Sequence, residues 1–177
     1  MKDRVREAVF NLIGDRVAGL HGVDLFAGTG ALGLEALSRG AGGATFVERH
    51  FPTAQVIEQN IATLEVQGLA RVVTGDTFLW AAGAPQLPAA PWLVFCAPPY
   101  EYYHTRTAEM IALVQTFLER APGGSLLVVE ADTAFDFAQL PDAHGWRVRS
   151  YPPAVIGIYQ VPDARDGAAE VTGMNGG

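Results

Sequence analysis

The sequence predicts a single α/β domain, in which a mostly parallel sheet carries helices on both faces. Three observations lead to this fold class. Short apolar runs alternate with helical patterns as far as residue 130, which is typical of a parallel sheet. Two more apolar runs follow without a helix between them, so we expect one of these closing strands to run antiparallel. The chain of 177 residues is 49% hydrophobic, which is enough for one globular core.

Composition limits where and how the protein works. We expect the domain to occupy residues 1–161 and the Gly- and Ala-rich segment 162–177 to be a disordered tail. The single cysteine, Cys96, rules out an internal disulfide framework and fits a reducing compartment. The charged N-terminus does not resemble a signal peptide, and no run approaches the roughly 18 apolar residues of a membrane span. We therefore expect a cytoplasmic monomer without a membrane partner.

Residues 3–13 are expected to form the first helix. Asp3 can cap its start, and Gly14 ends it. Its apolar stripe is expected to consist of Val5, Val9, Leu12 and Ile13. Arg6 and Phe10 lie four residues apart on a different face, so they share a surface that the stripe does not use.

Two strand–helix units come next. Their strands are expected at 21–26 and 43–48, and their helices at 31–39 and 52–66. Gly40 and Gly68 close the two helices, and Pro52 suits a first helical turn.

The second half continues this alternation before the pattern changes. Strands are expected at 70–76, 92–97 and 125–130, and a helix at 105–120. Three prolines mark a loop at 83–91, and Pro122-Gly123-Gly124 stops the helix. The closing strands are expected at 146–151 and 154–160, joined across Pro152-Pro153.

The turn after the first strand carries a glycine motif. Gly28, Gly30 and Gly33 satisfy G-x-G-x-x-G between a strand and a helix, and Glu48 ends the next strand, where dinucleotide-binding folds carry a ribose-binding acid. The motif alone fits a nicotinamide oxidoreductase, and it also fits a tight turn with close helix packing.

Three features favour a different nucleoside ligand. Asp24 lies inside the first strand, where a carboxylate suits an ammonium group better than a pyrophosphate. Asp76 ends the third strand, so acids at successive strand ends are expected to line one crevice. No basic residue lies within the loop to hold a phosphate. These conditions indicate S-adenosyl-L-methionine, with Glu48 on the ribose hydroxyls and Asp76 near the adenine amine, although solvated acids at strand ends are the simpler alternative.

Several segments resemble the RsmD family of S-adenosylmethionine-dependent methyltransferases, which modify a guanine exocyclic amine in bacterial 16S ribosomal RNA. The segments are DRVREAVFNLI, DLFAGTGALGLEALSRGA, FVE and PPY, in this order. The likeness runs from about Asp3 to Gln160, and the block from Asp24 to Ala41 is close to a family signature. The resemblance implies a Rossmann-like class I methyltransferase fold, with a seven-stranded sheet whose last strand is antiparallel. It also implies ribosomal RNA or the small-subunit particle as partner.

The resemblance implies a set of site residues as well. The cofactor-binding residues are expected to be Asp24, Phe26, Ala27, Gly28, Thr29, Gly30, Glu48, Arg49, Asp76 and Thr77. The substrate-binding residues are expected to be Arg6, Phe10, Tyr100 and Glu101. For Arg6 and Phe10, a solvated arginine above a core phenylalanine is the alternative. The four histidines are scattered without metal-ligand spacing, so no metal is expected.

The fourth strand ends in VFCAPPY, and related amine methyltransferases commonly carry Asp-Pro-Pro-Tyr or Asn-Pro-Pro-Tyr there. The amine hydrogens need acceptors, one from the acidic or amide side chain and one from the carbonyl of the first proline. Carried over to this chain, Pro98 supplies the carbonyl, Pro99 supplies rigidity, and Tyr100 stacks on an extruded base. A plain strand-ending turn is the alternative.

Position 97 departs from this motif because it holds alanine. Loss of one strong hydrogen bond at the reacting centre costs about 1.5–3 kcal/mol, or roughly 10- to 150-fold in rate. Proximity and alignment can supply roughly 7–11 kcal/mol, so methyl transfer remains feasible. Ala97 therefore leaves open a slow enzyme, an enzyme with a shifted substrate, or a catalytically silent domain that binds S-adenosylmethionine. Glu101 is a candidate replacement acceptor.

The charge balance bears on RNA binding. The net charge is −7 and Lys2 is the single lysine, so arginines are expected to hold any anionic partner. Affinity of the chain alone for RNA is expected to be weak and strongly dependent on salt.

Overall fold

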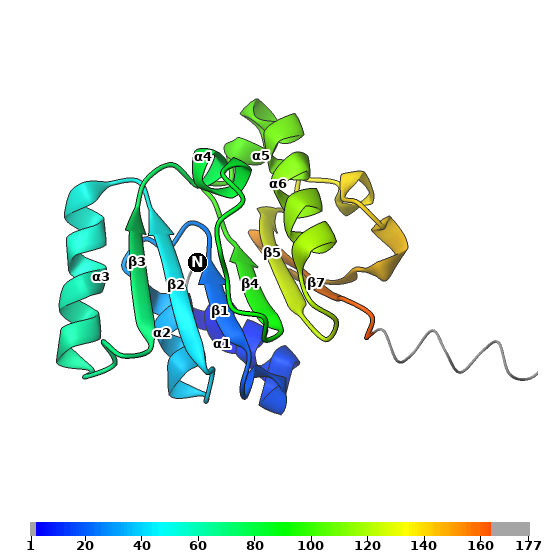
Figure 1. The fold of residues 1–177 in the computed structure, drawn as a ribbon. Coiled ribbons are helices and arrows are strands. Elements are labelled where there is room, and N and C mark those ends of the chain that lie inside the picture. Colours follow the sequence, from blue (N-terminus) through cyan, green and yellow to red (C-terminus); the bar gives the residue numbers. More distant parts are fainter. Residues whose placement is uncertain (1–2, 164–177) are drawn as a thin grey trace, which may run out of the picture.

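The computed structural model describes residues 3–163 as one seven-stranded sheet flanked by helices (Figure 1). The strands are β1 (His21–Asp24), β2 (Gly43–Glu48), β3 (Ala70–Thr74), β4 (Trp92–Cys96), β5 (Leu126–Asp132), β6 (Arg147–Tyr151) and β7 (Ala154–Gln160). They lie in the order β3-β2-β1-β4-β5-β7-β6. Strands β1 to β5 pair in parallel, and β7 pairs antiparallel with both β5 and β6. The predicted fold class, including the antiparallel last strand, is confirmed.

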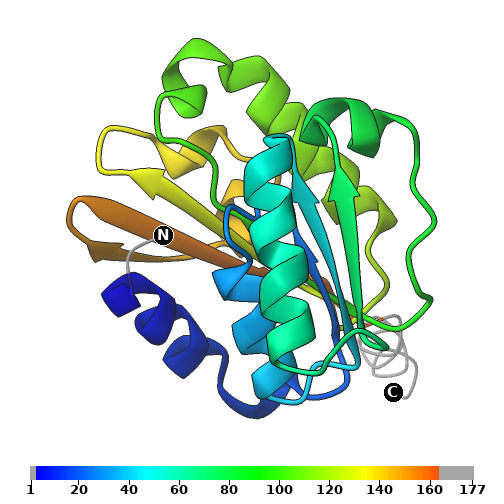
Figure 2. The same ribbon diagram turned by 90° about the vertical axis from the view of Figure 1, so that its left-hand side faces the viewer.

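Six α-helices occur within residues 3–163, and they divide between the two faces of the sheet (Figures 1 and 2). The helices are α1 (Asp3–Ile13), α2 (Ala31–Ser38), α3 (Phe51–Thr63), α4 (Thr77–Ala82), α5 (Tyr102–Thr105) and α6 (Thr107–Arg120). Helices α1, α2 and α3 bury their apolar residues against one face, and α4, α5 and α6 cover the other. Each face of the strands is therefore apolar, as expected for a sheet covered on both sides.

The strand order determines where in the sheet a ligand-binding site can form. The chain runs outward from β1 through β2 to β3, and then returns to the other side of β1 as β4. The connections from β1 and β4 therefore diverge at the carboxyl ends of two neighbouring strands. In open α/β sheets this reversal point leaves a crevice in which ligands bind.

Helix α1 packs differently from the predicted stripe. Phe10 is fully buried, and Leu12 keeps 37% of its surface exposed. The Phe10 ring meets Phe95 of β4 with ring centroids 5.7 Å apart, so the buried stripe is Val5, Val9, Phe10 and Ile13.

Two helices differ from expectation. Helix α4 was not predicted, and the helix expected at 105–120 is preceded by a separate turn, α5, with Arg106 between α5 and α6. The expected tail, 162–177, lies almost wholly outside the described residues. In the described part of the chain no helix is both long and apolar enough to cross a membrane, and no cluster of three potential metal-ligating side chains occurs.

Candidate active site

The glycine turn connects β1 to α2. Gly28 and Gly30 adopt left-handed backbone angles, with φ of +54° and +88°, which side chains rarely tolerate. The Gly30 amide donates a 2.7 Å hydrogen bond to the Ala27 carbonyl and closes the turn. Gly33 has a different role: a Cβ there would lie 2.3 Å from the Phe46 ring, so only glycine lets α2 approach β2 this closely. The motif therefore serves both the turn and the packing.

Glu48, at the end of β2, is held by backbone amides. Its Oε2 accepts a 2.9 Å hydrogen bond from the Gly28 amide, and its Oε1 accepts a 2.8 Å bond from the His50 amide. The carboxylate is thereby fixed against the glycine turn, and each oxygen retains a lone pair for a further donor.

Asp76 begins α4. Its Oδ1 accepts hydrogen bonds from the Phe78 and Leu79 amides at 2.9 and 3.1 Å, which is the geometry of a helix N-cap. The next residue, Thr77, donates its hydroxyl to the carbonyl of Leu25 in the glycine turn. These contacts tie the start of α4 to the end of β1.

A cavity of about 310 Å³ opens at this edge of the sheet. Its lining comprises Phe26, Gly28, Val47, Glu48, Arg49, Asp76, Thr77, Phe78, Ala97, Pro98, Pro99 and Tyr102. The cavity thus brings together the glycine turn, the predicted acids Glu48 and Asp76, and the proline segment, Ala97–Tyr100, of which the first three residues line it. Its volume lies at the lower end of the range for small-molecule sites.

One wall of the cavity is aromatic. The rings of Phe26, Phe78 and Tyr102 lie with centroids 6.0–6.3 Å apart. Arg106 stacks over Phe78 at 4.0 Å and pairs with Glu109 at 2.6 Å, which fixes the outer side of this wall. Such a wall can hold a flat, apolar ring system such as adenine.

Asp24 does not line the cavity, contrary to prediction. It is 1% exposed, and its Oδ2 accepts a 3.2 Å hydrogen bond from the Gly33 amide. Its Oδ1 is buried without a hydrogen-bond partner among the described residues. Burial raises the pKa of this carboxyl from its ordinary 3.8 to about 7. Asp24 therefore lies beneath the turn, where it contacts α2, and two acids rather than three face the cavity.

The proline segment divides between two cavities. Ala97, Pro98 and Pro99 line the first. The Pro99 carbonyl accepts a 3.0 Å hydrogen bond from the Tyr102 amide, whereas the Pro98 carbonyl accepts none from any described residue. The acceptor predicted at Pro98 is therefore free for a ligand.

Tyr100 lines a second cavity, of about 300 Å³, together with Arg4 of α1 and the turn between β6 and β7. The Tyr100 hydroxyl donates a 2.8 Å hydrogen bond to Oε1 of Glu130, a buried residue of β5. Burial, and then this bond to Glu130, raises the pKa of the phenol, so Tyr100 is neutral at physiological pH.

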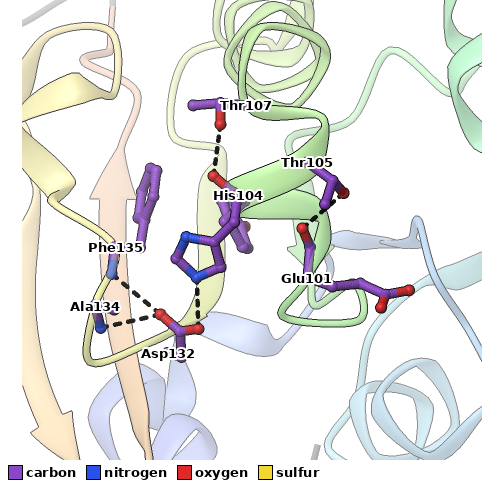
Figure 3. A network of polar contacts seen from close by, with 8 residues as sticks. Glu101, His104, Thr105, Thr107, Asp132, Ala134 and Phe135 are labelled. Atoms are coloured by element: carbon purple, nitrogen blue, oxygen red, sulfur yellow. Dashed lines mark hydrogen bonds and ion pairs between the residues drawn. The ribbon is translucent and has the colours of Figure 1, made fainter.

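Three predicted substrate residues are not brought to either cavity. Phe10 is buried in the core, so its expected role in substrate binding is wrong and the alternative, a core phenylalanine, is confirmed. Arg6 forms a 3.1 Å ion pair with Asp3 and lines neither cavity. Glu101 is exposed and also lines neither, and Figure 3 shows its carboxylate directed away from Asp132. Nothing in this arrangement makes Glu101 a replacement for the acceptor missing at position 97.

A polar pair lies beside this segment. His104 Nε2 is 2.7 Å from Oδ2 of Asp132, whose other oxygen accepts the amides of Ala134 and Phe135 (Figure 3). The hydrogen bond from His104 lowers the pKa of Asp132. The pair links α5 to the end of β5 and thereby restrains the segment that follows Tyr100.

Sequence reasoning missed the aromatic wall. Phe78 and Tyr102 belong to the short helices α4 and α5, which apolar periodicity does not reveal. One usable signal was present: Asp76 followed by Thr77 and an apolar run is a helix N-cap pattern. The predicted residues Ala27, Thr29 and Gly30 belong to the turn but do not line the cavity.

Comparisons with known proteins agree with this geometry. The profile of the family described as Conserved hypothetical protein 95 matches residues 1–160. YlbH of Bacillus subtilis, named as a candidate rRNA methyltransferase, is 32% identical over 162 residues, which are 89% of this chain and 85% of YlbH. Ribosomal RNA small subunit methyltransferase D of Escherichia coli strain K12 is 44% identical over 100 residues. That match spans 55% of this chain and about half, 48%, of the Escherichia coli protein.

A solved structure supports the same relationship. A candidate methyltransferase from Escherichia coli superimposes with a TM-score of 0.74 at 31% identity, covering 92% of this chain and 86% of the other. The similarity therefore extends across both the glycine turn and the closing strands.

Proposed function

This chain belongs to the RsmD family, described as Conserved hypothetical protein 95, and on that premise we propose that it methylates a guanine exocyclic amine in 16S ribosomal RNA. The methyl donor is S-adenosylmethionine. The observation that carries the proposal is the shared cavity, which Glu48 and Asp76 line together with Ala97, Pro98 and Pro99. A nucleoside donor and an amine acceptor are thereby brought to the same short segment.

The residues of the cavity fit this cofactor. Glu48 is anchored by two backbone amides and can still accept the two ribose hydroxyls. Asp76 uses Oδ1 as a helix cap and offers its other oxygen to the adenine amine, beside the aromatic wall. Gly28 lines the cavity, and a Cβ built there meets nothing within 4 Å, so the backbone at this point leaves space for a ligand.

In this reaction the protein mainly has to position the methyl donor and the target amine. The bound cofactor supplies an electrophilic methyl group on a sulfonium. The Pro98 carbonyl can accept a hydrogen bond from an N–H of the target amine and so direct the nitrogen lone pair toward that methyl group. The Tyr100 ring, held by its bond to Glu130, offers a face on which the extruded base can stack.

Ala97 sets the expected rate. It lines the cavity beside Pro98 but has no polar atom, so one amine hydrogen lacks a side-chain acceptor. A loss of about 1.5–3 kcal/mol predicts a slow enzyme. The same observation favours a second candidate function, a domain that binds S-adenosylmethionine without transferring its methyl group.

Two measurements on one sample test the proposal. Calorimetry should show binding of S-adenosylmethionine and its demethylated product, with no comparable affinity for NADH. Tritiated methyl groups should then enter small-subunit RNA or particles that lack the modification. Cofactor binding without incorporation selects the silent domain, and tight NADH binding contradicts both candidates.

A further inference from the structure

Strand β6 carries two exposed arginines and a half-buried tyrosine on one face of the sheet. Its pairing with β7 places Arg147 opposite Ile158, Arg149 opposite Ile156 and Tyr151 opposite Ala154. Directly opposed residues of an antiparallel pair point to the same face. The three β7 partners belong to the apolar cluster that packs against α1. Arg147, Arg149 and Tyr151 therefore lie on the face of the sheet that carries α1.

This row lines two cavities between β6 and α1, which are together called the groove below. Arg147 and Arg149 line a small cavity of about 50 Å³ with Leu12 of α1. Tyr151 lines the 300 Å³ cavity that holds Arg4 and Tyr100. Because β6 runs antiparallel to β7, as β5 does, its carboxyl end lies at the same edge of the sheet as the candidate active site. The two cavities lie along β6, the smaller at Arg147 and Arg149 and the larger at Tyr151 and Tyr100.

The groove concentrates positive charge in a protein of net charge −7. Within residues 3–163, no ion pair within 4.0 Å involves Arg4, Arg147 or Arg149. A fourth arginine, Arg16, lies close enough to Arg147 that burial and then this neighbouring charge lower its pKa. Like charges gathered on one surface repel each other and destabilise a fold slightly, so an anionic ligand is the simplest reason to keep them.

Strand geometry suits a polymeric anion. Residues two apart on a strand project side chains about 6.6 Å apart on one face, so Arg147 and Arg149 can contact different phosphates of one strand. Tyr151 and Tyr100 then offer ring surfaces at the end of the groove, and bases of a single strand stack on such surfaces.

We propose that this arginine groove, formed by Arg4, Arg147, Arg149 and Tyr151, binds the single-stranded RNA segment that leads to the target base. The inference rests on the proposed function for the identity of the polymer. Arg147 and Arg149 neutralise phosphates, and Tyr151 stacks on the base next to the one at Tyr100. Arg16 orders the end of α1 through bonds to the Leu12 and Ile13 carbonyls, so it is unsuitable as a test position.

The test compares two charge removals by fluorescence anisotropy with a labelled single-stranded fragment of 16S RNA. The first protein is the R147Q/R149Q double variant. The matched control is R71Q, because Arg71 is an exposed residue of β3 on the opposite edge of the sheet. Each lost phosphate contact should lower the slope of log K against log salt by about 0.7. The double variant should therefore lose about 1.4 in slope and bind on the order of 10-fold more weakly at low salt, while R71Q keeps the wild-type slope.

A second pair of variants separates stacking from charge. Y151A should weaken binding by roughly 5- to 150-fold with an unchanged salt slope, and Y151F should restore it. The thermal midpoint of each variant shows that it is folded. Either of two results would overturn the proposal. One is an equal slope of log K against log salt for R147Q/R149Q and R71Q. The other is no RNA binding by the wild-type protein at 25 mM salt.

Methyl transfer is measured on the same samples, so that the two proposals fail separately. If R147Q/R149Q has a reduced salt slope but the wild-type protein transfers no methyl group, RNA binding by the groove is supported and the proposed activity is contradicted. Normal transfer with equal slopes supports the activity and contradicts the groove.

Discussion

The Tyr100 hydroxyl donates a 2.8 Å hydrogen bond to the carboxylate of Glu130, which lies 3% exposed in β5. This bond fixes the last residue of the proline segment to the neighbouring strand. It also directs the ring toward the cavity beside Arg4 and away from the one that holds Glu48. The surfaces proposed for substrate and cofactor therefore meet at Pro98-Pro99-Tyr100.

Substitutions at Tyr100 should distinguish the contribution of the aromatic ring from that of the hydroxyl, which donates to Glu130. Y100F keeps the stacking face but removes the donor to Glu130, so we expect a free energy of unfolding lower by about 1–3 kcal/mol and a largely preserved rate. Y100A removes the ring as well and should reduce methyl transfer by roughly 5- to 150-fold. Urea unfolding and single-turnover transfer measure the two effects. Equal rates for Y100A and wild type would exclude Tyr100 as a stacking surface.

Restoring the acceptor at position 97 should raise the rate. Ala97→Asp places a carboxylate beside Pro98 in the cavity, and we expect about 10- to 150-fold faster transfer. Ala97→Leu is the matched control, since leucine has a similar shape and no acceptor. A gain with aspartate alone identifies the acceptor as limiting; a similar result for both variants contradicts that role.

Glu48→Gln should weaken cofactor binding. The substitution preserves size but replaces an anion that two amides hold in place, so we expect roughly 10- to 150-fold lower affinity for S-adenosylmethionine. Glu35→Gln is the control, because Glu35 is a surface residue of α2 that pairs with Arg39. Calorimetry measures both variants. Unchanged binding by Glu48→Gln would show that the ribose lies elsewhere.

Gly33→Ala should destabilise the fold. The added Cβ would lie 2.3 Å from the Phe46 ring, and relieving such overpacking costs typically 1–3 kcal/mol. At Gly68 a Cβ would meet nothing within 4 Å, so Gly68→Ala should change the free energy of unfolding by well under about 1 kcal/mol. Urea denaturation compares the pair, and equal midpoints would contradict the close approach of α2 to β2.

The buried carboxyl of Asp24 should make stability depend on pH. The folded protein keeps its proton up to about pH 7, whereas the unfolded chain releases it near 3.8, so unfolding releases protons between these values. This residue's contribution to the free energy of unfolding is therefore largest below pH 3.8 and is lost as pH rises through 7. Asp24→Asn removes the dependence, so its stability relative to wild type should increase by up to roughly 4 kcal/mol between pH 4 and 8. A pH-independent difference in urea titrations would show that Asp24 ionises normally.

The sequence predicts the sheet well because each strand is an apolar run bounded by turn residues. All seven strands appear within a few residues of their predicted ranges. Helix α4 was missed because it has only six residues, too few to show a period. Leu12 and Phe10 exchanged roles because both are apolar, and the sequence does not show that the Phe10 ring packs against Phe95 of β4.

The structure brings predicted site residues to one cavity where they follow strand ends in sequence, and it departs from the prediction where burial depth decides a residue's position. Glu48, Asp76 and Pro98 reach the cavity because the carboxyl ends of parallel strands share an edge. Asp24 ends a strand too, but its carboxylate turns under the glycine turn to meet the Gly33 amide. The sequence pattern does not indicate in which direction the Asp24 carboxylate points. It also does not reveal that aromatic rings from another helix, such as Tyr102, line the cavity.

The two large cavities share no lining residue among those described, and they meet at one short piece of chain. Under the proposed function, the nucleoside would occupy the first cavity and the polymer the second, with the target amine reaching the first cavity at Pro98. Turnover should accordingly follow a random order of arrival, with each ligand's product competing against its own precursor alone.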